Sequence, residues 1–241
     1  MTKPILLIFS LLCFTFSFGQ TKSLYGVTSS TGDTSFWYKY QIKQLNKLSL
    51  PLLDTSSSKE YYRLWTNKQV IEIWQDHNGT FGGNLITWTD EYVPNNEKPT
   101  NRTYTKVKPL TSDTAQFVRQ LFFSSGILNM PTDDSIKGWQ QGFDGIEYIL
   151  ERSTNDAYSF KTYWTPKAQD SLKEAMQVQA FVDSVFSLVN AQQAWQFFAK
   201  AIPYECYING GPSVACKVLT VKERKKYIKE RKNYRQHRHL Q

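Results

Sequence analysis

Histidine and cysteine are scarce in this chain of 241 residues, which has only three of each. His77 is the only histidine before residue 237, and it precedes an Asn-Gly pair that is typical of a hairpin turn. A Ser-His-Asp or Cys-His centre needs a histidine held in a formed pocket, and a zinc site needs three or four nitrogen or sulfur ligands. We therefore expect neither kind of centre and interpret His77 as an exposed turn residue.

Phosphate-binding and paired-acid motifs are also missing. Neither GxxxxGK[ST] nor GxGxxG occurs, so nothing supports nucleotide binding. The Asp133-Asp134 pair lacks the spaced acidic loop of a calcium hand, and we expect it in a solvated turn. Glu147 and Glu151 share one face of a predicted strand, at a separation of roughly 13 Å. Glycosidase carboxylates lie about 5 to 9.5 Å apart, so this spacing alone makes no catalytic pair. We expect no cofactor.

The chain has a single long apolar run, residues 4–18, which follows Lys3. Small residues at 17 and 19 suit a signal peptidase, and Gln20 would be the new N-terminus. We therefore predict a signal peptide over 1–19 and a mature protein that is exported, periplasmic or extracellular. Leu12 stands where a lipoprotein signal has a small residue, so we do not interpret Cys13 as a lipid anchor. No later run reaches 18 apolar residues, and no transmembrane segment is expected after cleavage.

Two cysteines remain after such a cleavage, Cys206 and Cys216. In an exported protein two nearby thiols most simply form a disulfide. The Ile208–Pro212 stretch between them contains Asn-Gly-Gly and turns easily. The alternative is a reactive or metal-binding pair.

Basic residues are concentrated at the C-terminus. Residues 217–241 hold ten Lys and Arg against Glu223 and Glu230, a balance of +8 that equals the net charge of the whole chain. The rest of the protein is therefore near neutral, and the expected organisation is one domain over 20–216 followed by a basic tail. A charged tail of this kind is usually a solvated extension, and few apolar residues there could join a core. The alternative is that it binds an anionic envelope surface, lipid headgroups or lipopolysaccharide, or nucleic acid outside the cell.

Strand and helix signals together predict an α+β domain with a mainly antiparallel sheet of hairpins and packed helices. Alternating β-rich stretches and Gly-containing turns indicate the strands, and apolar stripes between caps indicate the helices. Expected strands are 61–65, 70–74, 85–88, 104–110 and the hairpin 145–164; expected helices are 36–50, 111–125, one from Thr165 to about 189, and 191–202.

The 145–164 hairpin has a predicted register. A three-residue loop, Ser153 to Asn155, would place Glu147 opposite Lys161 as a surface ion pair. The same register pairs Arg152 with Asp156, Leu150 with Tyr158 and Tyr148 with Phe160.

Two residues are candidates for binding. Trp139 lies in a polar stretch and is expected to be partly exposed, and Asp144 lies between two glycines at the start of a strand. Asp144 either has a special role as an acid or only turns the chain. Trp164, Trp65 and Trp74 would be able to stack on sugars or hold a peptide, although strand aromatics more often belong to the core.

Several segments resemble exported proteins of Bacteroidota that have no assigned activity. They are the signal ending Phe16–Gln20 and the segments Tyr61–Trp65, Gly142–Tyr148 and Tyr163–Pro166. The resemblance covers about residues 59–190 and implies export, with no activity and no functional residue.

Two functions follow as hypotheses. The first is an exported, non-enzymatic binding or envelope-associated protein, because no catalytic constellation is evident. The alternative is a hydrolase that acts on cell-surface glycan or peptide through carboxylates such as Asp144. A deep cleft lined by two or more acids would favour the hydrolase, and the sequence indicates no oligomeric state.

Overall fold

The computed structural model describes residues 22–28, 32–56, 58–94 and 98–238, and the predicted signal peptide lies outside them. Within these ranges the chain folds into a curled, mostly antiparallel sheet of nine strands with five α-helices, which confirms the predicted α+β class. The strands are β1 (Ser23–Tyr25), β2 (Glu60–Trp65), β3 (Gln69–Gln75), β4 (Phe81–Tyr92), β5 (Thr103–Leu110), β6 (Glu147–Thr154), β7 (Ala157–Trp164), β8 (Cys206–Ile208) and β9 (Val214–Cys216). The helices are α1 (Phe36–Leu48), α2 (Ser112–Ser124), α3 (Lys173–Val189), α4 (Ala191–Ala201) and α5 (Val221–Arg238).

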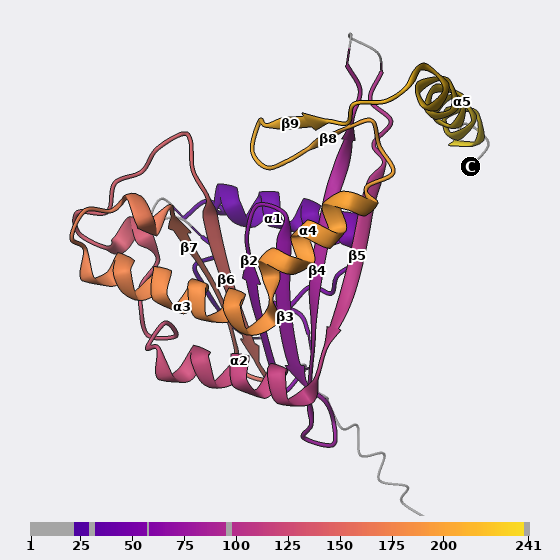
Figure 1. The fold of residues 1–241 in the computed structure, drawn as a ribbon. Coiled ribbons are helices and arrows are strands. Elements are labelled where there is room, and N and C mark those ends of the chain that lie inside the picture. Colours follow the sequence, from indigo (N-terminus) through magenta and orange to yellow (C-terminus); the bar gives the residue numbers. More distant parts are fainter. Residues whose placement is uncertain (1–21, 29–31, 57, 95–97, 239–241) are drawn as a thin grey trace, which may run out of the picture.

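The strand order is β1-β7-β6-β2-β3-β4-β8-β9, with β5 also paired to β4. Only β1 runs parallel to its neighbour, β7. β4 is much longer than β2 and β3, so it continues beyond the turn that joins them. There Glu91 and Tyr92 pair with β8, and the β8–β9 hairpin extends across the end of β2 and β3 (Figure 1).

Helices cover both faces of the sheet, with α2, α3 and α4 on one face and α1 on the other (Figure 1). Because successive side chains of a strand point to opposite faces, β2 contributes to two cores. Tyr62 and Leu64 pack with α2 and α3 in the larger core, whereas Tyr61 and Trp65 pack in the smaller core toward α1.

The sequence predicted the start of α2 correctly and the start of α3 wrongly. Thr111 caps α2 as expected, because its side chain accepts a hydrogen bond from the backbone N–H of Thr114 at 3.2 Å. Thr165, by contrast, does not start a long helix. It has a left-handed backbone (φ 36°) before a single 3₁₀ turn, Pro166–Ala168, and α3 begins only at Lys173.

The predicted register of the β6–β7 hairpin is wrong by three residues. Leu150 lies opposite Lys161, Glu147 lies opposite Trp164, and the turn has two residues, 155 and 156. When the register shifts by an odd number of residues, side chains that were predicted to share one face of the sheet lie on opposite faces. Glu147 therefore faces α1 with Ile149, whereas Lys161 lies on the opposite face. The tertiary contacts of Lys161 explain the difference, because its Nζ donates to the carbonyls of Ile127, Leu128 and Met130 at 2.7 to 3.3 Å.

Candidate ligand-binding site

A pocket of about 480 Å³ lies above the turn between β2 and β3. α1 forms one wall, the ends of β4, β6 and β7 form the others, and the β8–β9 loop lies over it through Ile208 and Gly211. Its volume falls within the range of small-molecule sites. Seven aromatic side chains line it: Phe36, Trp37, Tyr40, Trp65, Trp88, Phe143 and Trp164.

Three of these aromatic side chains are exposed. Phe36 is 71% exposed, Tyr40 is 45% exposed and Phe143 is fully exposed. Large apolar side chains that gather at the edge of an apolar pocket often mark a place where something binds. Trp164, which is half-buried at the end of β7, also lines the pocket and is one of the tryptophans that the sequence nominated for stacking.

Three polar atoms on residues that line the pocket are buried and have no hydrogen-bond partner within the described part of the chain. They are Nε2 of Gln41, Oε1 of Gln44 and Oε1 of Glu147. The Gln41 side chain belongs to a residue that is only 3% exposed. A buried polar atom without a partner destabilises the folded state by roughly 1–3 kcal/mol. Three such atoms beside one pocket therefore lower the stability of the ligand-free protein. A ligand that supplied their partners would remove this destabilisation.

Glu147 has the most unusual electrostatics in the pocket. Burial, and then the negative charge of Asp133, raises its pKa to about 8, against a smaller lowering by the backbone N–H of Tyr163. The carboxyl group is therefore protonated at neutral pH and can donate a hydrogen bond. Carboxyl groups with such shifts are concentrated at functional sites.

Asp133 is buried rather than solvated, which corrects the expectation from sequence. It is 3% exposed and accepts hydrogen bonds from the backbone N–H of Trp164 at 2.7 Å and the hydroxyl of Thr162 at 3.0 Å. β1 pairs only with residues 157–159 of β7, and the Asp133 carboxylate provides the hydrogen-bond partner for the backbone N–H of Trp164 at the far end of that strand. The same position brings its charge close to Glu147.

Asp90 is the second acid of the pocket, and it has strong partners. It forms ion pairs with Lys47 and with Lys68, the latter at 3.6 Å, and accepts a hydrogen bond from Thr103 at 2.8 Å. Burial alone would raise its pKa, but these partners outweigh burial and lower it. Asp90 is therefore ionised where Glu147 is neutral.

Trp65 is held from below by a buried ionic cluster. Its indole N–H donates to Oε2 of Glu151 at 2.5 Å, and the guanidinium of Arg63 lies 3.5 Å from the same oxygen. Glu72 pairs with Arg63 on the other side at 3.1 Å. Arg63 is wholly buried, so the cluster needs this pairing to offset the loss of hydration. We infer that it fixes the orientation of the Trp65 ring in the pocket wall.

The Gly142–Gly145 segment serves the pocket through its glycines rather than through its acid. A Cβ atom at either glycine would overlap the side chain of Trp164 or its neighbour Thr165, so the loop backbone packs directly on the indole. Asp144 is exposed on this loop and does not line the pocket.

Trp139, the other candidate from sequence, is buried rather than partly exposed. It is 9% exposed, packs on Tyr163 in the larger core and donates its indole N–H to the carbonyl of Trp164 at 3.0 Å. This packing weighs against a role as a stacking surface.

The β8–β9 hairpin is closed by the predicted disulfide, Cys206–Cys216. The two residues lie opposite one another with their Cα atoms 4.0 Å apart. The hydroxyl of Thr89 donates to the carbonyl of Ile208 at 2.6 Å. These links hold the hairpin over the pocket.

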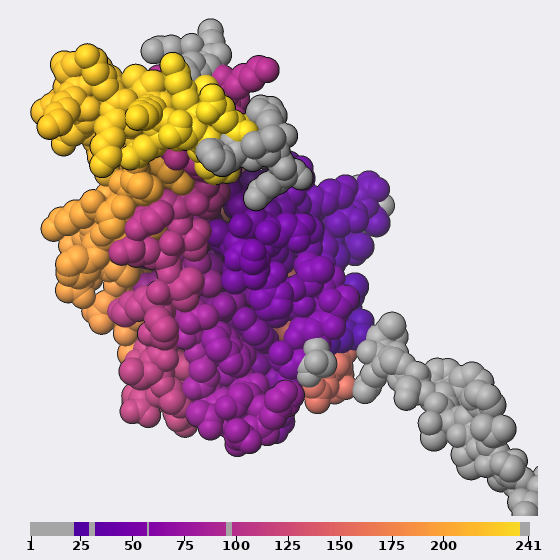
Figure 2. Space-filling view, turned by 90° about the vertical axis from the view of Figure 1, so that its right-hand side faces the viewer, coloured from indigo at the N-terminus to yellow at the C-terminus, as the bar shows by residue number. Residues whose placement is uncertain are grey.

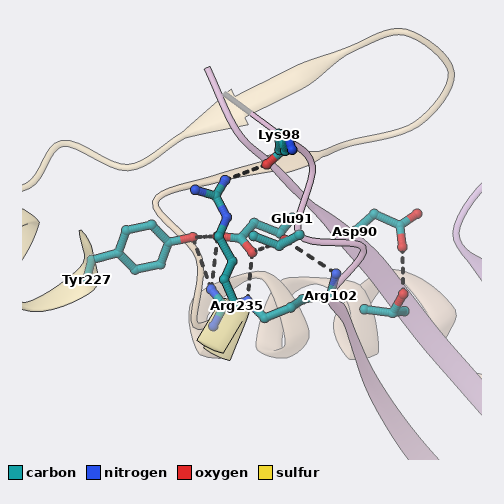
Figure 3. A network of polar contacts seen from close by, with 8 residues as sticks. Asp90, Glu91, Lys98, Arg102, Tyr227 and Arg235 are labelled. Carbon is teal, nitrogen blue, oxygen red and sulfur yellow. Dashed lines mark hydrogen bonds and ion pairs between the residues drawn. The ribbon is translucent and has the colours of Figure 1, made fainter. Parts of the chain in front are cut away.

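Residues 221–238 of the basic tail form a helix, α5, that docks at the end of the β4–β5 hairpin (Figure 3). Arg102 pairs with Glu91 through two hydrogen bonds of 2.6 and 2.9 Å, and the hydroxyl of Tyr227 donates to the same carboxylate. Tyr227 is 7% exposed and packs with Phe198. One residue of the tail therefore joins a core after all.

Two structural features are absent from the described part of the chain. No helix within it is both long and apolar enough to cross a membrane, and it holds no cluster of three His, Cys, Asp or Glu suited to a metal ion. His77 is exposed at the β3–β4 turn, as predicted. No protein-family model matches the chain, and no curated protein matches it in sequence.

Proposed function

We propose that this protein is an exported binding protein that holds a small ligand without transforming it. The observation that carries the proposal is the aromatic pocket above the β2–β3 turn with its three unpartnered polar atoms. Aromatic walls supply contact area, and a few polar groups set orientation, which is the usual composition of a ligand site. The disulfide between Cys206 and Cys216 supports export.

The arrangement of acids favours binding over catalysis. Glu147 is neutral and lines one wall, while Asp90 is neutralised by two lysines at the other end. The strand order separates them, since β2 and β3 lie between β6 and β4. Three strand spacings amount to roughly 14 Å, beyond the range of about 5 to 9.5 Å used by paired glycosidase carboxylates.

Native mass spectrometry of the protein recovered from its own envelope tests the proposal. We expect a non-covalent small-molecule adduct that is retained by Trp74→Phe, a variant outside the pocket, and reduced by Trp164→Ala. An adduct retained equally by both variants, or none after recovery without dialysis, would contradict the proposal.

A hydrolase remains the second candidate because Glu147 has the neutral carboxyl that a general acid requires. Glu147→Gln separates the two functions. In a binding protein the amide still pairs with the ligand and affinity is kept, whereas in a hydrolase turnover of the same compound disappears while binding remains.

We also propose that α5 holds the protein at an anionic envelope surface. Five lysine side chains of this helix are exposed: Lys222, Lys225, Lys226, Lys229 and Lys232. It forms one end of the molecule (Figure 2). A helix that is docked by Tyr227 and Arg102 presents these charges together, which favours electrostatic attraction. Vesicle binding, described in the Discussion, is its test.

A further inference from the structure

We propose that the ligand of this pocket is a neutral saccharide of one or two sugar rings. This inference rests on the proposed function and names the ligand class of the same site. It is carried by the relative orientation of the aromatic rings and by the kinds of polar atoms left without partners.

The aromatic rings meet at steep angles. Trp65 and Trp88 lie edge to face, with centroids 5.8 Å apart and planes at 81°. On α1, Trp37 meets Tyr40 at 89° and Phe36 at 74°. These pairs form corners rather than parallel slots. A flat ring stacks best between parallel faces, whereas a puckered sugar places C–H groups against walls of different orientation.

The unpartnered atoms have hydrogen-bonding requirements that hydroxyl groups can satisfy. Nε2 of Gln41 is a donor, Oε1 of Gln44 is an acceptor, and the protonated carboxyl of Glu147 takes part as either. A hydroxyl group both donates and accepts, so one type of ligand group satisfies all three. The amides come from α1 and the carboxyl from β6, and a sugar carries hydroxyls around its edge, where it would meet both walls.

The charges near the pocket favour a ligand without an acid or an amine. Asp90 already pairs with Lys47 and Lys68. At the opposite wall, an anionic ligand would meet the neighbouring charge of Asp133, and no cation of the described residues acts on Glu147 to offset it. A cationic ligand would have to displace the proton of Glu147, and Lys68, which lines the pocket, would repel it.

Isothermal titration calorimetry with neutral disaccharides of glucose, galactose and N-acetylglucosamine tests the inference, with the full mature protein at pH 6.5. We expect at least one to bind. Glu147→Leu should weaken binding about tenfold, equivalent to about 1.4 kcal/mol, and Glu147→Gln should stay within about threefold of the wild type. Trp74→Phe, which alters a tryptophan outside the pocket, should leave the affinity unchanged.

Parallel titrations with adenosine, a glucuronic-acid disaccharide and a Phe-Phe dipeptide distinguish failure of the saccharide inference from failure of the proposed function. If one of these binds with the same variant pattern and the neutral sugars do not, the saccharide inference is wrong and the proposed function stands. If no compound binds and the envelope-purified protein carries no adduct, both are wrong. If a sugar binds with equal affinity to wild type and Glu147→Leu, it binds elsewhere and the inference is overturned.

Discussion

Glu147 lies directly opposite Trp164 in the β6–β7 ladder, and both line the same pocket. The pairing places a neutral carboxyl group beside an aromatic ring at the end of the sheet. It also removes Glu147 from Lys161, whose amine is used by three backbone carbonyls on the other face.

The stability of the protein should depend on the ionisation of Glu147. Its pKa is about 8 in the folded state and near 4.3 in an unfolded chain, so the folded state binds the proton more tightly. The free energy of unfolding should therefore fall as pH rises from about 5 to 8. Glu147→Gln, which cannot ionise, should lack this contribution.

Urea unfolding of both proteins between pH 5 and 9 measures the difference. The advantage of the wild type over Glu147→Gln should shrink by up to about 1.4 kcal/mol per pH unit across that window. Lys161 has a pKa lowered to about 8 by burial and by Arg152, and it affects both proteins alike. Parallel pH profiles would show that Glu147 is ionised in the folded protein at neutral pH.

The disulfide should stabilise the hairpin over the pocket. For a loop of this length the chain-entropy estimate is about 2.5–3 kcal/mol. Cys206→Ala with Cys216→Ala should lose a part of that in unfolding experiments and should weaken ligand binding, because Ile208 and Gly211 line the pocket. Non-reducing mass spectrometry of the native protein should show no free thiol at either position. Two free thiols would contradict the pairing.

The exposed lysines of α5 should bind anionic vesicles in a salt-dependent manner. The Debye length falls from about 10 Å at 0.1 M salt to about 3 Å at 1 M, so binding should weaken steeply over that range. Lys225→Gln with Lys229→Gln and Lys232→Gln should lower it, while Lys39→Gln with Lys43→Gln and Lys59→Gln serves as a control of equal charge elsewhere.

These substitutions are preferable to deletion of the tail, because deletion would leave Glu91 and Arg102 without Tyr227 and destabilise the fold. Equal vesicle sedimentation of both triple variants and the wild type at low salt would contradict a role for α5.

Local signals in the sequence were sufficient for much of the fold. The Thr111 cap, the Asn-Gly turn after His77 and the spacing of Cys206 and Cys216 each predicted what the structure shows. Such features depend on residues that are close in the chain. The hairpin register was predicted from matching charges and was wrong, because packing of Lys161 against a distant segment outweighs a surface ion pair.

The candidate site was harder to predict for the same reason. Residue type alone nominates Trp65 and Trp164, but the pocket that both line is assembled from segments that are far apart in the chain. Nothing in the sequence indicated that Gln41 belongs to the site, because a glutamine on a helix is common and its burial depends on distant residues. The Gly142–Gly145 segment did stand out, although Gly142, Phe143 and Gly145 line the pocket and Asp144 does not.

The central claim is that polar groups beside the pocket are kept for a ligand and not for the fold. Gln41→Met tests it most directly, because methionine has a similar shape and no amide. Gln69→Met is the matched control, since Nε2 of this buried glutamine donates to the carbonyl of Ala191 at 2.9 Å and to Thr87 at 3.2 Å.

The measurement is the free energy of unfolding of both variants without ligand. The account predicts that Gln41→Met is as stable as the wild type or more stable by about 1 kcal/mol, whereas Gln69→Met loses roughly 1–3 kcal/mol. A loss in Gln41→Met as large as that in Gln69→Met would show that Gln41 serves the fold, and would contradict the account.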